Sequence, residues 1–160
     1  MVKVRRATDA DVEALLAMFG GLDDFHTRHL PHIFHGSSTQ PRSREFITGL
    51  CAGPRSVVFV AELGGPVVGQ IVGRIREAPV HPLLAPRKFG EIDELFVMDS
   101  ARRQGVARQL IHAVEEWVRS FGVTSIELGV WEFNVSAMRL YESLGYSTQS
   151  RRMSRTLSDD

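Results

Sequence analysis

Three carboxylates lie close together in one short stretch of the chain, at Glu91, Asp93 and Glu94. A carboxylate can take a proton from a reacting group and so act as a general base. In an ideal strand Glu91 and Asp93 share one face, and Glu94 points to the other. A β-bulge would change this alternation, because it inserts one extra residue into the strand. The alternative for each carboxylate is a solvent-facing side chain paired with an arginine.

A basic turn follows this stretch and precedes the strongest helical pattern in the chain. Arg102 and Arg103 lie in the turn, Gly105 ends it, and the helical pattern begins at Val106. The first N–H groups of a helix have no backbone partner and lie at the positive end of its dipole, so they suit a phosphate. Gly105 would let a phosphate approach closely, and Arg102, Arg103 and Arg108 would add cationic donors that bind the cofactor. The alternative is an ordinary strand-to-helix turn with solvated arginines; neither common nucleotide loop, GxxxxGK[ST] or GxGxxG after a strand, occurs.

The turn resembles a known motif. The hexad Arg102-x-x-Gly105-x-Ala107 is similar to the [RQ]-x-x-G-x-[GA] acyl-CoA signature of the GNAT superfamily of N-acetyltransferases. Ala107 stands where many members have glycine, which is an allowed variant. The stretch from Glu91 to Val97 looks like the fourth strand of that family.

A second segment strengthens the resemblance. It looks like the helix that follows the fifth strand of GNAT enzymes, and it reads Asn134-x-x-Ala137-x-x-x-Tyr141-x-x-x-Gly145-Tyr146. The order of expected elements over roughly the whole chain is also that of the family. The resemblance implies an acyltransferase that moves an acetyl group from acetyl-CoA to a primary amine.

The resemblance also implies how acetyl-CoA would bind as co-substrate. Its pantetheine arm would lie in a V-shaped opening between the fourth and fifth strands and contact the main chain of Phe96, Val97 and Met98. The pyrophosphate would be bound by the main chain at Arg103, Gln104, Gly105, Val106, Ala107 and Arg108. Asn134 would cap its helix and contact the pantetheine or an ordered water.

Direct attack on the thioester needs a neutral amine, so a base must first take the amine's proton. Members of the family often carry the carboxylate at the position of Glu91 and some at that of Asp93. We therefore rank these residues first and second as the base, and Glu94 third. Tyr141 is the expected acid for the leaving thiolate. Its alternative role is a buried core tyrosine, and both roles hold if the ring is buried and the hydroxyl reaches the site.

Apolar periodicity predicts the elements that must position these residues. Strands are expected over residues 2–7, 57–63, 67–76, 90–98, 124–130 and 146–157. A capping box at Thr8 and Asp11 begins a first helix, which Gly20-Gly21 would end. Further helices are expected over residues 22–34, where Pro31 would break or kink the helix, and over 43–50, 106–121 and 134–144.

The element order predicts a single α/β domain over residues 1–160. Gly64-Gly65 indicates a hairpin with antiparallel strands, whereas the later β-α-β crossover makes a parallel pair. The expected fold is a GNAT-like mixed, mostly antiparallel sheet with helices on both faces. The resemblance adds a splay of the sheet between strands 4 and 5.

Composition excludes several other classes of protein. The 160 residues carry 19 basic and 19 acidic side chains, so no net charge would attract nucleic acid or a membrane surface. The apolar runs are too short to span a membrane, and the charged N-terminus lacks a signal-type apolar core, so we expect a cytoplasmic protein. A single cysteine, Cys51, cannot form an internal disulfide and is expected to be inert packing.

Four histidines recur at every third residue: His26, His29, His32 and His35. Pro31 interrupts the helix that would have to align them, so we expect no metal site there. By the resemblance this region walls the acceptor pocket, and the residues of interest are Asp23, Asp24, Phe25 and His26. Solvated surface is the alternative.

The sequence does not decide whether the acceptor is a small-molecule amine or a protein N-terminus or lysine. If Asp23 and Asp24 converge with the strand carboxylates, the pocket is acidic and favours a cationic amine. In the alternative arrangement, Arg74 and Arg76 of the neighbouring strand neutralise the cluster. A homodimer, common in the family, would form through the edge of the final strand. The rival functions are a non-catalytic acyl-CoA sensor and an enzyme that binds a nucleotide phosphate at the same helix start.

Overall fold

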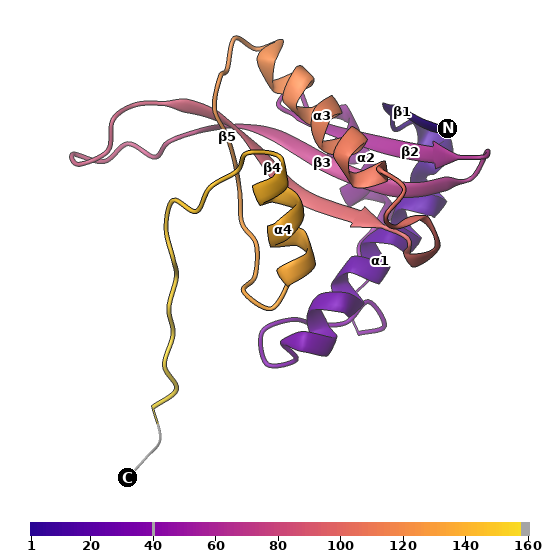
Figure 1. Ribbon diagram of the computed structural model, residues 1–160, viewed down its shortest axis with the longest axis horizontal. Coiled ribbons are helices and arrows are strands. Elements are labelled where there is room, and N and C mark those ends of the chain that lie inside the picture. Colours follow the sequence, from indigo (N-terminus) through magenta and orange to yellow (C-terminus); the bar gives the residue numbers. More distant parts are fainter. Residues whose placement is uncertain (40, 158–160) are drawn as a thin grey trace. The chain divides into compact units, whose positions relative to one another are not determined.

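The computed structural model describes residues 1–39 and 41–157, and these form five strands and four α-helices (Figure 1). The strands are β1 (Val2–Arg6), β2 (Ser56–Leu63), β3 (Val67–Glu77), β4 (Lys88–Val97) and β5 (Ile126–Leu128). The helices are α1 (Val12–His29), α2 (Arg44–Ala52), α3 (Val106–Arg119) and α4 (Val135–Ser143), with 3₁₀ turns η1 (Asp9–Asp11) and η2 (Asp99–Ala101) before α1 and α3. The chain forms two compact units, Met1–Gly129 and Val130–Asp160. None of the described helices is long and apolar enough to cross a membrane.

The five strands form one mixed sheet in the order β1-β2-β3-β4-β5. The first four pair antiparallel, and β4 pairs with β5 in parallel. That parallel pairing joins only residues 90–92 of β4 to β5, which ends at Leu128 while β4 continues to Val97. The predicted mixed, mostly antiparallel sheet, opened between its fourth and fifth strands, is therefore confirmed.

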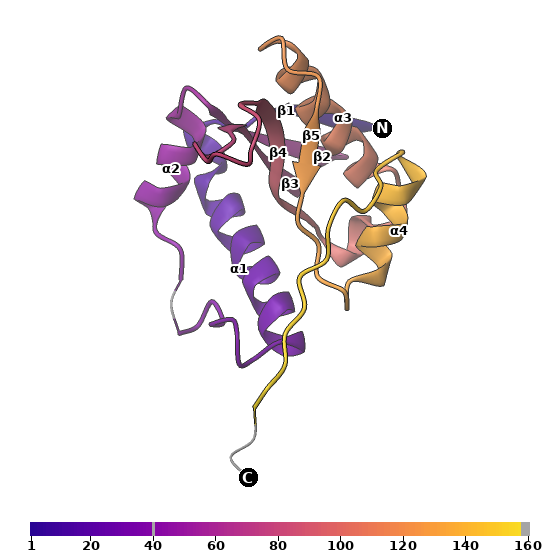
Figure 2. The ribbon, with the colours of Figure 1, turned by 90° about the vertical axis from the view of Figure 1, so that its left-hand side faces the viewer.

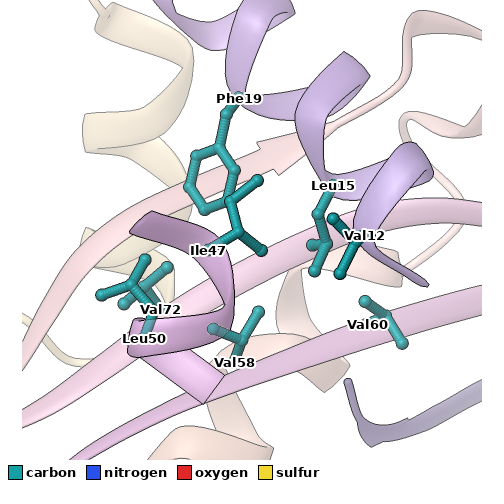
Figure 3. Packing of buried hydrophobic residues seen from close by; sticks show 8 residues of the cluster. All are labelled: Val12, Leu15, Phe19, Ile47, Leu50, Val58, Val60 and Val72. Atoms are coloured by element: carbon teal, nitrogen blue, oxygen red, sulfur yellow. The ribbon is translucent and has the colours of Figure 1, made fainter. Parts of the chain in front are cut away.

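Helices cover both faces of the sheet, with α1 and α2 on one face and α3 on the other (Figure 2). The core beneath α1 and α2 contains the buried cluster of Val12, Leu15, Phe19, Ile47, Leu50, Val58, Val60 and Val72 (Figure 3). Cys51 packs against this cluster, as expected for an inert cysteine. Gly73 follows Val72 in β3 and faces α3 instead, because a Cβ there would lie 2.8 Å from Val114. The sheet therefore separates two distinct packing layers.

Helix α1 continues through Gly20-Gly21, where the sequence predicted its end. Tertiary packing overrides the weak helix propensity of glycine here, because apolar residues on both sides of the pair are buried. A Cβ on Gly21 would lie 2.8 Å from Cζ of Phe96, so the glycine lets α1 approach β4 closely. The helix ends at His29, two residues before Pro31, in line with the restriction that proline places on the residue preceding it. The two helices expected before and after the glycines are thus one.

The prediction of a last strand over residues 146–157 is wrong, because these residues form no strand. A strand needs an apolar face that it can bury against its neighbours. This segment is polar, and its apolar Met153 and Leu157 are 90% and 79% exposed. The strand edge that we expected to serve a homodimer is therefore not present in this segment.

The two glycines of α1 offer a matched test of the packing. Gly20→Ala should stabilise the protein by about 0.5–1 kcal/mol, because alanine is the better helix former and its Cβ would meet only Ser37 at an ordinary 3.4 Å. Gly21→Ala should gain less or lose stability, because its Cβ would displace the ring of Phe96. Urea unfolding of both variants measures the difference. Equal gains would contradict the close approach of α1 to β4.

Candidate active site

One extra residue in β4 decides where its carboxylates point. Val72 pairs with Glu94 and Gly73 pairs with Ile92, so Asp93 is a bulge between the two pairs. Directly paired residues of an antiparallel ladder place their side chains on the same face. Since Val72 belongs to the core beneath α1 and α2, Glu94 points to that face as well. Simple alternation predicted that Glu94 faces away from Glu91 and Asp93. The bulge at Asp93 changes this alternation.

The two carboxylates that the sequence ranked first are in ion pairs near the surface. Glu91 accepts a hydrogen bond from Arg76 Nε at 2.5 Å, and Asp93 accepts one from Arg74 Nε at 2.8 Å. Each carboxylate side chain is 31% exposed. This is the alternative arrangement, in which arginines of the neighbouring strand neutralise the cluster. Glu91 and Asp93 therefore do not make the pocket acidic.

Glu94 has a different environment. Its side chain is only 17% exposed, and Oε1 accepts a hydrogen bond from Arg42 Nη1 at 2.5 Å. The other oxygen, Oε2, is buried and has no hydrogen-bond partner among the described residues. Burial raises the pKa of Glu94, and nearby Asp93 and Asp23 add to the rise, while Arg42 opposes it. Perturbed carboxylates of this kind are common at functional sites.

Arg42 is a candidate that sequence reasoning missed. It lies before α2 and donates to Asp23 of α1 through Nε and Nη2, at 2.9 and 2.6 Å, while it also holds Glu94. Its guanidinium carbon is 4.7 Å from the ring centroid of Phe19 and 5.6 Å from that of Phe46. Arg42 therefore links α1, α2 and β4. No local pattern marks it, because its partners are distant in the sequence.

The turn before α3 has a backbone shape that suits an anion. Its last residue, Gly105, is the N-cap of α3 with φ of 80°, and Arg103 has φ of 61° although it is not a glycine. A Cβ on Gly105 would meet nothing within 4 Å, so the space beside the helix start is open. The first helical bond runs from Gln109 N to Gly105 O, and the N–H groups from Val106 onward lie ahead of it. These N–H groups and the open space lie where the sequence predicts a phosphate site, and phosphate binding there stays a prediction.

The side chains of the turn are used to hold its shape. Arg102 Nε donates to the main-chain oxygen of Val97 at 3.3 Å, and its Nη2 lies 2.8 Å from Asp99 Oδ1. Gln104 Nε2 donates to Ser100 O at 3.1 Å. Arg102 therefore ties the end of β4 to the turn, and the main-chain N–H groups stay the predicted donors for an anion. The carbonyl of Val97 retains a second lone pair for a ligand.

A groove of about 880 Å³ lies between α1, the end of β4 and η2. Phe96, Met98 and Arg102 line it on one side, and Asp24 and Phe25 of α1 line it on the other. Residues predicted to bind the cofactor therefore share one groove with residues predicted to wall the acceptor pocket.

The segment after α1 is hydrogen-bonded to Asp24, which lines the groove. Asp24 accepts hydrogen bonds from the main-chain N–H of Ser37 at 2.9 Å and from its hydroxyl at 3.1 Å. The ring of His26 stacks on that of Phe34 with centroids 5.0 Å apart, and burial lowers the pKa of this histidine.

In the part of the chain that the structure describes, no three His, Cys, Asp or Glu side chains are grouped as a metal site requires.

Helix α4 of the second unit carries the expected acid. Tyr141 is 9% exposed, and burial raises its pKa to about 12, so its hydroxyl keeps its proton at neutral pH. Asn134 Oδ1 accepts a hydrogen bond from Ala137 N at 3.2 Å, which confirms the predicted helix cap. The low exposure of Tyr141 confirms that its ring is buried. Its role as an acid stays a prediction.

Comparison with known proteins identifies the family. The model of the acetyltransferase (GNAT) family matches residues 23–146. The match covers both the basic turn and the α4 segment, which carried the resemblance in the sequence. The chain belongs to this family of acetyltransferases.

Individual relatives agree with the family. Human N-acetyltransferase 8 is 32% identical over 77 residues, which are 48% of this chain and 34% of that protein, so this chain matches about a third of its length. The uncharacterized N-acetyltransferase YhfO of Bacillus subtilis is 22% identical over 145 residues, 91% of this chain and 89% of its own. A solved tetramutant of the BH1408 protein from Bacillus halodurans is 25% identical with a TM-score of 0.88, covering 97% of this chain and 99% of its own. AAC(6')-Iy, solved with a CoA-S-monomethyl-acetylneamine bisubstrate analog, shares the fold at 20% identity and a TM-score of 0.73, over 99% of both chains.

The left-handed backbone at Gly105 can be tested by substitution. Gly105→Ala should lower the free energy of unfolding by about 1–2 kcal/mol, because an L-residue with a Cβ is strained at this φ and nothing else surrounds the position within 4 Å. Gly105→Asn is the matched control and should cost less, because asparagine tolerates this region. Urea unfolding measures both. Equal costs for alanine and asparagine would argue against the left-handed turn.

Proposed function

We propose that the protein transfers the acetyl group of acetyl-CoA to a primary amine by direct attack in a ternary complex. The observation that carries this proposal is the turn before α3, where Gly105 opens the helix start next to the end of β4 that β5 leaves unpaired. The family match over residues 23–146 extends across both compact units, which supports a single acetyltransferase domain over residues 1–160.

Thiol release from acetyl-CoA, measured with a panel of amines, tests the proposal. Peptides, lysine derivatives, polyamines, aminoglycosides and amino acids form the panel. A protein that binds acetyl-CoA but releases no CoA with any of them would be a non-catalytic acyl-CoA sensor.

The end of β4 and the turn after it would hold acetyl-CoA. The main chain of Phe96, Val97 and Met98 would contact the pantetheine arm along the open edge of β4. Main-chain N–H groups would bind the pyrophosphate, at Arg103, Gln104, Gly105, Val106, Ala107 and Arg108. The open space at Gly105 supports this assignment, because it leaves room for a phosphate against the backbone.

Catalysis would require three proton transfers, because the nitrogen of the ammonium group loses one proton before its attack and a second one after it, and the thiolate gains one. A base takes the proton of the ammonium group, and the neutral nitrogen attacks the acetyl carbonyl, so that an N–C bond forms and the C–S bond breaks. A carboxylate of β4 is the proposed base, and Glu91 and Asp93 are the candidates that the sequence favours. Tyr141 would give its proton to the leaving thiolate, and its pKa of about 12 keeps that proton in place until then. The second proton that the nitrogen loses after its attack would restore the Tyr141 hydroxyl.

The acceptor would bind in the groove beside α1. Charges of both signs line this groove, from Asp24 and Asp99 and from Arg28 and Arg102. A uniformly acidic pocket for a simple cation is therefore not supported. AAC(6')-Iy, which shares the fold, is an aminoglycoside N-acetyltransferase, and this supports an amine acceptor. A small-molecule amine and a protein N-terminus or lysine stay open, and the cytoplasmic location and homodimer stay predictions.

The phosphate site predicts a specific loss of binding. Gly105→Glu would place an anion against the pyrophosphate and should weaken CoA binding by several kcal/mol. Calorimetric titration with CoA measures this, with Gly105→Asn as a control for the backbone. Unchanged affinity in folded Gly105→Glu would remove the assignment of the pyrophosphate to this turn.

The acid role of Tyr141 predicts a loss of rate without a loss of structure. Tyr141→Phe keeps the buried ring, so the fold and CoA affinity should be retained. The rate of acetyl transfer should fall about 10²-fold if the hydroxyl protonates the thiolate. Tyr146→Phe, at the ring that packs 5.7 Å from that of Tyr141, is the matched control. Single-turnover rates that are equal in the two variants would return Tyr141 to a packing role alone.

A further inference from the structure

Two buried polar side chains on the α1 face of the sheet lack hydrogen-bond partners among the described residues. Gln70 is 0% exposed, and neither its Oε1 nor its Nε2 has a partner. Oε2 of Glu94 is also buried and has no partner among these residues. Buried polar atoms are normally paired with protein or with bound water, because leaving them unpaired costs free energy. The three atoms therefore suggest a molecule that hydrogen-bonds to them.

The register of β3 and β4 places these atoms together. Gln70 pairs with Phe96, and Val72 pairs with Glu94. Gln70 and Glu94 are therefore diagonal neighbours on one face, a relation in which Cα atoms are roughly 7–8 Å apart. A buried water needs about two to four polar partners, and these side chains offer two acceptors and one donor. One water can donate to Glu94 Oε2 and Gln70 Oε1 and accept from Gln70 Nε2.

Gln70 and Glu94 lie next to the groove, and Arg42 orients Glu94. Phe96, the cross-strand partner of Gln70, lines the groove. Arg42 holds only Oε1 of Glu94, and its guanidinium is itself fixed by Asp23 and by the ring of Phe19. This contact leaves Oε2 available as the acceptor.

We propose that Glu94 and Gln70 hold one water molecule, and that Glu94 takes the proton of the acceptor amine through it. The inference rests on the acetyl transfer proposed above and assigns its base to the third carboxylate of β4. The ammonium N–H bond breaks and its proton passes to the water, while the water passes one of its own protons to Oε2. The neutral amine then attacks the acetyl carbon, and the C–S bond breaks. Arg42 is a positioning residue, because it acts on the amine only through Glu94.

The charges around Glu94 suit this role. Arg42 from the loop, Asp23 from α1 and Asp93 from β4 influence it, and His26 is close enough to Arg42 to respond to that charge. Burial raises the pKa of Glu94 towards neutral pH, which makes its carboxylate a stronger base. Only the ionised form accepts a proton, so activity should rise as the pH rises through this pKa.

The Gln70→Leu variant tests the role of the water in catalysis separately from the stability of the fold. It removes both amide atoms at similar side-chain size, so kcat should fall at least about 10-fold. Stability should change little, because leucine fills the same buried space and needs no hydrogen-bond partner. Calorimetry should show unchanged affinity for acetyl-CoA. A folded Gln70→Leu with the wild-type kcat and pH profile would overturn the inference, and Gln70→Met serves the same measurement if leucine prevents folding.

The pH profile separates Glu94 from the other carboxylates. Glu94→Gln should lower kcat about 10²-fold and remove the acidic limb of the kcat profile. Arg42→Gln should shift that limb to higher pH, because the lost cation no longer favours the ionised carboxylate. Val58→Ala, in the core on the same face, should lower stability without moving the limb. The inference is wrong if Glu91→Gln or Asp93→Asn removes the limb while Glu94→Gln keeps it.

A high-resolution crystal structure of the wild type gives a readout that does not depend on activity. It should show a water within about 3.2 Å of Glu94 Oε2 and of the Gln70 amide. Hydrogen bonds from Gln70 to protein groups, with no water at Oε2, would overturn the inference and leave the proposed acetyl transfer intact. A wild type that contains this water but acetylates no amine would instead refute the acetyl transfer, and the proton route with it.

Discussion

The arrangement of the candidate site depends on one extra residue in β4. Because Asp93 is inserted opposite the step from Val72 to Gly73, Glu94 turns to the face that α1 and α2 cover. Without the bulge it would face α3, in an apolar layer that offers a carboxylate no counter-ion. With it, Glu94 meets Arg42, and Arg42 in turn meets Asp23 of α1. A change in strand pairing thus creates a link between three elements.

Arginines then give the carboxylates of β4 different properties. Arg74 and Arg76 neutralise Asp93 and Glu91 where solvent also screens them, so these pairs contribute little to stability. Glu94 is paired through one oxygen only, in a place that solvent hardly reaches. Desolvation and an incomplete set of hydrogen bonds keep this carboxylate chemically distinct. The charge in the sequence is the same at all three positions, and the surroundings make the difference.

The turn before α3 is a proposed binding surface made of main chain. The side chain of Arg102, which the sequence predicts as a cationic donor for a phosphate, bonds to the carbonyl of Val97, and that of Gln104 bonds to the carbonyl of Ser100. Gly105 takes a left-handed conformation with open space beside it. The side chains therefore fix the loop, and the helix start presents the donors. Such a surface tolerates sequence change as long as the backbone conformation is kept.

The sequence alone determined the features that depend on local order. The hexad ending at Ala107, the cap at Asn134 and the alternating strands identified the family and the mixed sheet, because turns, caps and periodic faces are set by neighbouring residues. Only the tertiary structure decided the features that depend on distant partners. Helix α1 passes through its glycines because Phe96 of β4 packs there, and residues 146–157 form no strand because they have too little apolar surface to bury. Likewise, the bulge and the contacts of Arg42 follow from pairing between strands and loops far apart in the chain, which no local pattern records.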